Sequence, residues 1–317
     1  MARRWPCVRW WAALLMAACS PLWAAEPDAD EPGDFPFPTL QQEHRNALSS
    51  CADPYTWPVV QRPAPSQTRE RRLWDARKSY TPLDWEFNAS AQGLCARPLT
   101  HPPEASLPFA PPNGAAALTT TTATLQVADG WLYGRLMHYV GGGLYWADAQ
   151  GGQARRLVDE PALGLLLQPR GDVLALTGFA HLGSAEGGLW KLHKADAGWR
   201  AVRLNRWPER PCAWTQARDG TLFVSFPTQL VVGPPQGPFR TLWEGDEGMG
   251  CRTRQVHLDE GRQTLWWSAG PFVGALDLQN LALRHHLRSE ALLQAYSPAW
   301  ERAVLREAHN PAHEHHP

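Results

Sequence analysis

Short runs of alternating apolar and polar residues follow one another from about residue 119 onward. Alternation over four to eight residues predicts a β-strand with one buried face. Between such runs lie turns with a glycine, which tolerates the positive φ that a tight hairpin needs. The four clearest turns are Asp129-Gly130, Arg170-Gly171, Asp219-Gly220 and Glu260-Gly261. The pattern therefore predicts a series of β-hairpins.

The hairpins recur at a nearly constant interval, since successive turn glycines are 41, 49 and 41 residues apart. Each hairpin is followed by a third strand-like segment, beginning with "GGLYWADA", "GGLWKLHK", "QLVVGPP" and "FVGALDL" in turn. A fourth segment comes next, "ARRLV", "WRAVRL", "FRTLW" and "LALRHHL". Units of four strands with a period in the forties are typical of β-propeller blades.

On this period and hairpin pattern, residues 119–290 resemble β-propeller repeat proteins as a class. The G-H and W-D markers of the WD40 type are missing in register, so no specific family is indicated. The resemblance implies an all-β fold of four-stranded antiparallel blades. We expect four clear blades, with residues 81–90 and 302–308 supplying strands of a further blade, so that five or six close the ring. A β-sandwich or barrel with evenly spaced hairpins stays open as the alternative.

The first 25 residues predict an export signal, because arginines precede a nine-residue apolar stretch and small residues follow it. A bilayer span needs about 20 apolar residues, so we expect no transmembrane anchor. Cleavage near Ala25 would leave a soluble periplasmic protein. Cleavage before Cys19 would leave a lipid-anchored one, with lipid attached to that cysteine. Both cleavage sites remain open.

The other segments differ in composition from the repeats. We interpret them as a Pro-rich leader at 26–70, an irregular segment at 71–118 that could supply a blade, closing strands at 291–307 and a His-rich tail at 308–317.

Outside the signal the chain has four cysteines, an even number that predicts two disulfides in an oxidising compartment. Cys212 and Cys251 precede their turn glycines by 8 and 10 residues, which places both at the start of the innermost strand of consecutive blades. Innermost strands converge on the propeller axis, so we pair Cys212 with Cys251. Cys51 and Cys95 then form the second bond by elimination.

The charge balance of 30 Lys and Arg against 31 Asp and Glu provides no basic field for nucleic acid or an anionic membrane. The sequence has no G-x-S-x-G, H-E-x-x-H, Walker or dinucleotide-binding motif. We therefore assign no catalytic residue, metal or cofactor, and take a protein of the cell envelope as the expected partner.

The loops opposite the glycine turns should gather at one rim of the propeller, and polar, charged and aromatic residues there suit protein binding. Such a protein would serve as an assembly scaffold or neutralise a toxin. The candidate binding residues are His138, Tyr139, His181, Glu186, Trp207, Arg210, Asp246 and Glu247. His138 and His181 occupy near-equivalent positions, but without a third ligand they do not indicate a metal site.

The alternative function is a hydrolase or lyase that acts on a carbohydrate or lactone in the central channel. That chemistry needs carboxylates or metal ligands on the inner strands. The four predicted inner strands offer glutamines instead, in a partly aligned ring of Gln126, Gln168, Gln216 and Gln255. A catalytic carboxylate would have to come from the N-terminal region.

Overall fold

The computed structural model describes residues 51–80, 84–90, 93–99, 106–110, 119–137, 142–181, 184–245 and 255–289. All of them belong to one compact unit, Phe37–Pro317. The predicted export signal, the leader up to residue 50, the closing strands at 291–307 and the His-rich tail lie outside the described residues. Within the described residues, no helix is long and apolar enough to span a membrane.

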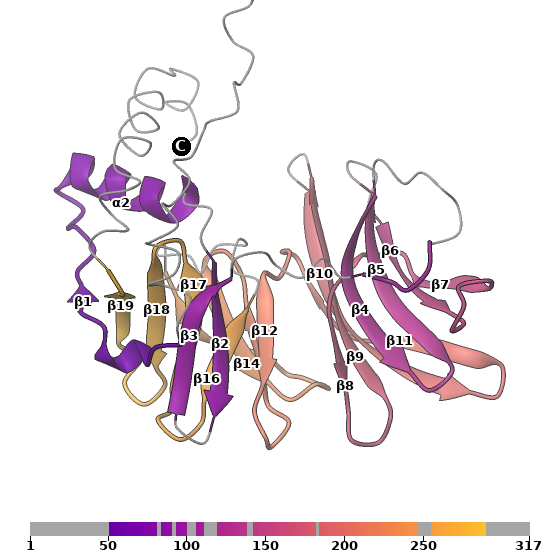
Figure 1. The fold of residues 1–317 in the computed structure, drawn as a ribbon. Coiled ribbons are helices and arrows are strands. Elements are labelled where there is room, and N and C mark those ends of the chain that lie inside the picture. Colours follow the sequence, from indigo (N-terminus) through magenta and orange to yellow (C-terminus); the bar gives the residue numbers. More distant parts are fainter. Residues whose placement is uncertain are drawn as a thin grey trace, which may run out of the picture. The chain divides into compact units, whose positions relative to one another are not determined.

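Each of the four predicted repeats forms one antiparallel sheet, with its strands side by side in chain order (Figure 1). We call these sheets blades 1 to 4. Blade 1 consists of β4 (Thr119–Val127), β5 (Gly130–Met137), β6 (Gly142–Ala147) and β7 (Ala154–Val158), and blade 2 of β8 (Ala162–Leu167), β9 (Val173–His181), β10 (Ser184–Ala195) and β11 (Gly198–Trp207). Blade 3 consists of β12 (Ala213–Gln216), β13 (Leu222–Ser225), β14 (Gln229–Gly233) and β15 (Arg240–Glu244), and blade 4 of β16 (Val256–Asp259), β17 (Thr264–Ala269), β18 (Phe272–Asp277) and β19 (Leu283–Leu287).

Both faces of the blades are buried, and this distinguishes the fold from a two-sheet sandwich. In β9, Val173 and Ala175 pack in the cluster shared with blade 1, whereas Leu174 and Leu176 pack in the cluster shared with blade 3. Successive side chains of a strand point to opposite faces, so one blade contacts two neighbours. A sandwich sheet would bury only one face against its partner sheet. The fold is therefore the predicted all-β arrangement of propeller blades.

Three of the four predicted turn glycines have positive φ: 147° at Gly130, 84° at Gly171 and 92° at Gly220. The fourth predicted turn also forms and contains Gly261, but the positive φ in it, 49°, belongs to Gln263 and not to Gly261. The physical reason is the position at which this turn begins. In each of three hairpins the last turn residue donates its amide to the carbonyl three residues earlier, and these residues are Gly171, Gly220 and Gln263. Gln263 therefore occupies the turn position that glycine occupies in the other two. Gly261 lies two residues before it.

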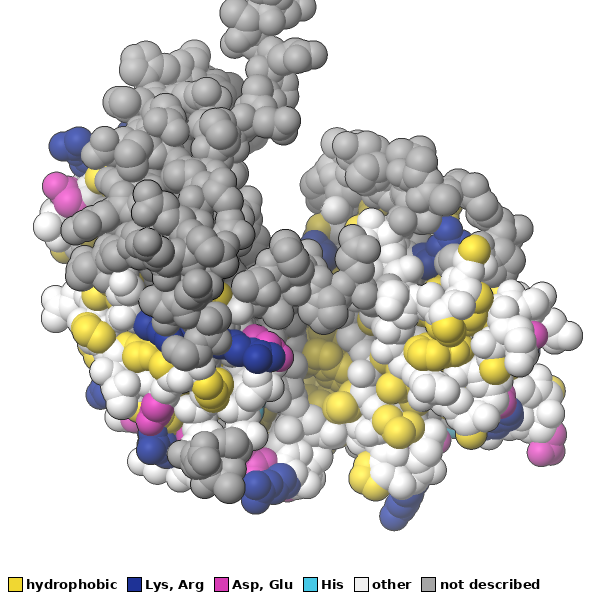
Figure 2. Space-filling model, viewed as in Figure 1, with side chains coloured by type: hydrophobic (Ala, Val, Ile, Leu, Met, Phe, Trp, Pro, Cys, Tyr) yellow, Lys and Arg dark blue, Asp and Glu magenta, His cyan; other side chains and the backbone are white. Residues whose placement is uncertain are grey.

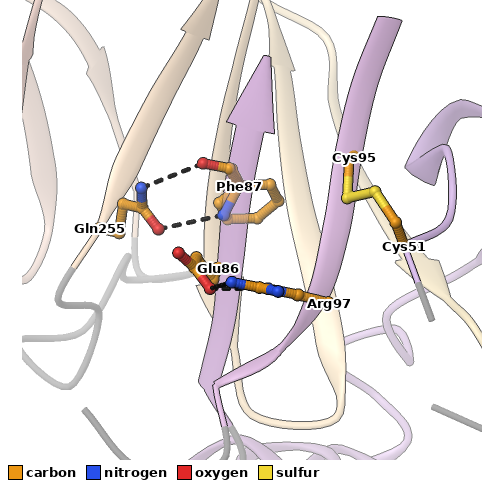
Figure 3. The surroundings of a disulfide bond; sticks show 6 residues. All are labelled: Cys51, Glu86, Phe87, Cys95, Arg97 and Gln255. Atoms are coloured by element: carbon orange, nitrogen blue, oxygen red, sulfur yellow. Dashed lines mark hydrogen bonds and ion pairs between the residues drawn. A yellow bond between two sulfur atoms is a disulfide. The ribbon is translucent and has the colours of Figure 1, made fainter. Parts of the chain in front are cut away.

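A fifth sheet contains β2 (Asp84–Ser90), which falls within the predicted strand segment 81–90, and β3 (Gly93–Leu99). Side chains of blade 4 bond to the backbone of β2. Ser268 Oγ accepts the amide of Trp85 at 3.1 Å, and the Gln255 amide bonds to both the N–H and the carbonyl of Phe87 (Figure 3). The fifth sheet therefore docks on blade 4 as a further blade would. The other predicted strand, 302–308, lies outside the described residues.

The described part of the leader runs along blade 4. After the 3₁₀ turn η1 (Pro54–Thr56), β1 (Val59–Val60) pairs with β19 as a fifth strand of that blade. The hydroxyl of Tyr55 donates to Asp259 Oδ2 at 2.9 Å. The helix α2 (Thr68–Tyr80) follows, in a stretch that contains no proline. Sequence reasoning did not anticipate α2 or β1.

The predicted disulfide between Cys51 and Cys95 is confirmed, with 5.4 Å between the two Cα atoms (Figure 3). It joins the leader to β3. Cys212 is also disulfide-bonded, and its partner lies outside the described residues because Cys51 and Cys95 bond to each other. Cys251 also lies outside them, so its pairing with Cys212 stays a prediction.

Candidate functional site

The predicted rim is described mainly through the crossover loop Trp207–Cys212, which connects blade 2 to blade 3. Among the candidate binding residues, the side chains of Glu186, Trp207 and Arg210 are described. His181 ends β9, but its side chain lies outside the described residues. Four further candidates lie wholly outside them: His138, Tyr139, Asp246 and Glu247.

The crossover loop is anchored at both ends. The Trp207 side chain is only 9% exposed and meets the rings of Phe226 and Phe239 edge-on, with ring centroids 5.5 and 5.3 Å apart. At the other end, Cys212 is disulfide-bonded and its amide donates to the carbonyl of Ser225 at 2.7 Å. Trp207, expected at the binding surface, therefore positions the loop from within the core.

The middle of the loop rests on glycines of blade 2. Pro211 lies against Gly178 of β9 and Gly187 of β10, so closely that a Cβ atom on either glycine would collide with the proline ring. Glycine is required at both positions because backbone and ring approach each other there. Close packing of Pro211 on these two glycines thus fixes the loop across the end of the blade 2 sheet.

Charged side chains of both signs lie around the crossover loop. Burial lowers the pKa of the Arg210 guanidinium, and the neighbouring Glu209 accepts a hydrogen bond from Gln229 at 3.4 Å. On blade 2, Arg206 and Glu186 form an ion pair at 2.9 Å, with side chains 67% and 43% exposed. Figure 2 likewise shows both signs of charge scattered over the visible face. The rim therefore presents mixed charge on a rigid support.

The preceding crossover loop, between blades 1 and 2, is fixed by Glu160. Its carboxylate accepts the Thr177 hydroxyl at 2.6 Å and forms an ion pair with Arg203. The Arg203 guanidinium also lies over the Trp190 ring, 4.4 Å from its centroid. The Glu160 side chain is 12% exposed and its oxygens are bonded, so it serves to hold the loop.

The same rim is covered by α2 at blade 4 (Figure 1), and Trp74 of α2 joins the core cluster between blades 3 and 4. Trp74 is 3% exposed and stacks on Phe272, the first residue of β18, with 4.2 Å between ring centroids. The same cluster includes Ala213 and Leu230, which lie at the rim ends of β12 and β14. Sequence reasoning did not predict that a helix packs on this rim. The apolar pair Leu73-Trp74 within an otherwise charged stretch was the feature of the sequence that could have indicated it.

The inner-strand glutamines do not form a continuous ring. Gln168 and Gln216 bond to each other through their side-chain amides, at 3.2 and 3.4 Å. Gln126 is exposed, and Gln255 bonds to the backbone of Phe87. The partly aligned ring expected from the spacing is thus reduced to one pair that joins blades 2 and 3.

Two acidic residues of the N-terminal region lie on β2, next to the inner strand β16: Asp84, whose side chain is outside the described residues, and Glu86. The Glu86 carboxylate accepts a hydrogen bond from Arg97 Nε at 2.8 Å across the β2–β3 pair (Figure 3). Within the described residues, no group of three or more His, Cys, Asp and Glu side chains could hold a metal ion.

Comparison with known proteins gave structural similarities only. A scan against protein-family models found no match, and neither did a search of curated proteins. XC5397, a gluconolactonase from Xanthomonas campestris, is 17% identical with a TM-score of 0.36, and the match covers 54% of this chain and 63% of that one. A protein of unknown function from Bacteroides caccae is 10% identical with a TM-score of 0.35 and coverage of 53% and 61%.

A third similar structure is the extracellular domain of BT3049, a putative hybrid two-component system from B. thetaiotaomicron. It is 13% identical with a TM-score of 0.34, and the match covers 66% of this chain and 28% of that one. The chain spans less than two thirds of the length of each of these three structures.

Proposed function

We propose that this protein is an exported, non-catalytic β-propeller that binds another protein of the cell envelope through the rim of blades 1 and 2. The observation that carries the proposal is the anchored crossover loop Trp207–Cys212. This loop is fixed by the buried Trp207, by Pro211 packed on two glycines of blade 2, and by the disulfide-bonded Cys212. A partner that meets a rigid surface loses little conformational entropy on binding.

The charges of the rim suit recognition of a protein. Arg206, Glu209 and Arg210 lie within five residues and combine both signs around the anchored loop. Mixed charges of this kind select a complementary partner and repel others, because like charges brought together cost several kcal/mol. A uniformly basic or acidic surface would attract any oppositely charged polymer instead.

The proposed location is the periplasm, in soluble form or anchored by lipid at Cys19. A disulfide between Cys51 and Cys95 is typical of exported chains, since thiols in the bacterial cytoplasm are kept reduced. The proposed roles are a scaffold in envelope assembly or the neutralisation of a toxin. A toxin gene beside the gene for this protein would favour the second role.

A charge-swapped variant tests the proposal. Arg206→Glu combined with Glu209→Lys reverses two rim charges and keeps the net charge, so we expect at least tenfold weaker capture of the partner from envelope extract. The matched control is Arg170→Glu with Asp196→Lys, which swaps two exposed charges at the opposite end of blade 2. Equal capture by both variants would contradict binding at this rim.

The hydrolase alternative is decided with the same purified protein. Turnover of a lactone or glycoside that disappears in Glu86→Gln would replace the binding proposal, because Glu86 is the β2 carboxylate whose side chain the structure describes. The binding proposal expects no such turnover.

A further inference from the structure

A cleft of about 400 Å³ lies between the hairpin ends of blades 3 and 4, at the opposite end of the blades from the rim. One wall is the β12–β13 hairpin and the other is the β16–β17 hairpin. The floor is apolar, with Ala217, Phe223, Leu258 and Leu278. The mouth is polar and includes Arg218, Asp219, Glu260 and Gln263.

The size and floor of the cleft suit one apolar side chain with its neighbouring backbone. Small-molecule pockets measure about 300 to 1,000 Å³, and this cleft lies near the lower limit. Phe223 belongs to the buried core cluster between blades 3 and 4, and the partly buried Leu258 and Leu278 pack against that cluster, so the floor is fixed by packing. An apolar group that enters is removed from water against this floor, which favours binding.

The charges at the mouth leave one carboxylate without a cation. Arg218 and Glu260 neutralise each other across the cleft, with Arg218 Nε 3.2 Å from Glu260 Oε2 and the Arg218 amide donating to Glu260 Oε1. Asp219 instead accepts the amide of Thr221 at 2.8 Å, and this hydrogen bond lowers the pKa of its carboxyl. Among the described residues Asp219 has no ion-pair partner, so its charge is available to a cation.

The turn at Gln263 is a second feature of this mouth. Gln263 has φ of 49°, at the turn position where the hairpins of blades 2 and 3 have glycine. Its side-chain amide donates to the carbonyl of Glu260 at 2.8 Å. A residue other than glycine in the left-handed region is uncommon, and such positions concentrate at functional sites. Here the unusual residue lines the cleft.

We propose that this cleft binds an extended peptide segment of a partner protein, with an apolar side chain on the floor and the next residue, Lys or Arg, at Asp219. A saccharide fits less well. Sugar rings stack on exposed aromatic faces, whereas Phe223 is only 8% exposed. The Glu260 carboxylate, which would otherwise bind sugar hydroxyls, is paired with Arg218. The proposed site is separate from the rim.

Fluorescence anisotropy with labelled peptides tests the proposal. We expect Gly-Ser-Leu-Arg-Ser-Gly to bind about tenfold tighter than the same peptide with serine in place of leucine. Asp219→Asn keeps the oxygen that accepts the Thr221 amide but removes the charge, so the Leu-Arg peptide should bind about threefold more weakly at low salt. A Leu-Glu peptide should not lose affinity.

The matched control is Asp148→Asn. Asp148 is also a turn carboxylate, which accepts the backbone amides of Gln150, Gly152 and Gln153 at 3.2, 2.9 and 3.0 Å, but it belongs to blade 1. This variant loses the same charge and should bind the Leu-Arg peptide like the wild type. Equal binding of all peptides, or equal effects of Asp219→Asn and Asp148→Asn, would overturn the proposal.

A floor variant completes the test. Leu278→Ser should weaken binding of the Leu-Arg peptide about tenfold. Urea unfolding checks that the variant is folded. Displacement of the peptide by di-N-acetylchitobiose, with the same sensitivity to Asp219→Asn, would show a saccharide site and overturn the peptide assignment. The rim variant Arg206→Glu with Glu209→Lys should bind the peptide normally, so failure at the rim and failure at the cleft are distinguishable.

Discussion

Replacement of Gln255 by alanine tests whether the β2–β3 sheet is a structural part of the propeller. The Gln255 side chain accepts the amide of Phe87 at 3.0 Å and donates to its carbonyl at 3.2 Å. Both bonds cross from blade 4 to β2, and the Phe87 side chain is 2% exposed. Alanine would leave a backbone donor and a backbone acceptor without these partners in a mostly buried environment.

The expected cost follows from the two hydrogen bonds. Each contributes about 0.5 to 1.5 kcal/mol net, so we expect a loss of about 2 kcal/mol in the free energy of unfolding. For a domain of this size about 2 to 4 °C of melting temperature corresponds to 1 kcal/mol, which gives a decrease of about 4 to 8 °C. Urea unfolding followed by tryptophan fluorescence measures the change under non-reducing conditions.

The matched control is Gln126→Ala, a glutamine of another predicted inner strand whose side chain is exposed. This change should cost less than about 0.5 kcal/mol, as is usual for surface substitutions. Equal destabilisation by the two variants would refute the reasoning, because it would mean that the bonds to Phe87 do not hold the fifth sheet on blade 4.

Three further predictions concern the turns, the leader and pH. Gly220→Val should destabilise by about 1 kcal/mol or more because φ is 92° there, whereas Gly261→Ala should change the urea midpoint little, since φ at Gly261 is not in that region. Replacement of Cys51 and Cys95 by alanine opens a loop of 44 residues and should cost about 4 kcal/mol in the chain-entropy model; a loss below about 1 kcal/mol would show that noncovalent contacts suffice. Burial lowers the pKa of His286, so its contribution to stability is complete above its ordinary pKa of 6.5 and is lost as pH falls through the lower folded-state value. Unfolding free energies at pH 7.5 and 5 should therefore differ less in His286→Gln than in the wild type, and an unchanged difference would contradict this role.

The strands were predictable because their signal is local. Alternation in segments such as "DVLALTG" is imposed by burial on two faces, and Leu174 and Ala175 indeed pack against different blades. The turn glycines Gly171 and Gly220 were predictable for the same reason, since their positive φ depends on the turn itself. The Cys51–Cys95 bond followed from counting cysteines and from the blade register.

Features that depend on tertiary contacts were not predictable. β1 has two residues and forms a strand only because β19 presents a free edge to it. Trp207 precedes a loop in the sequence, but its ring is buried because blade 3 supplies Phe226 and Phe239. Gln255 was grouped with the other inner-strand glutamines by spacing, although its partner is the backbone of Phe87, 168 residues away.

The most direct test of the proposed function is site-specific photo-crosslinking in the cell envelope. A photoreactive phenylalanine analogue at position 208, next to the anchored Trp207, reports contacts of the rim, and the same analogue at position 170 reports contacts of the hairpin end of blade 2. Binding through the rim predicts a defined protein adduct at position 208 that is absent at position 170 and is lost when Arg206→Glu and Glu209→Lys are added. The same adduct at position 170 alone, or no adduct at position 208, would contradict it.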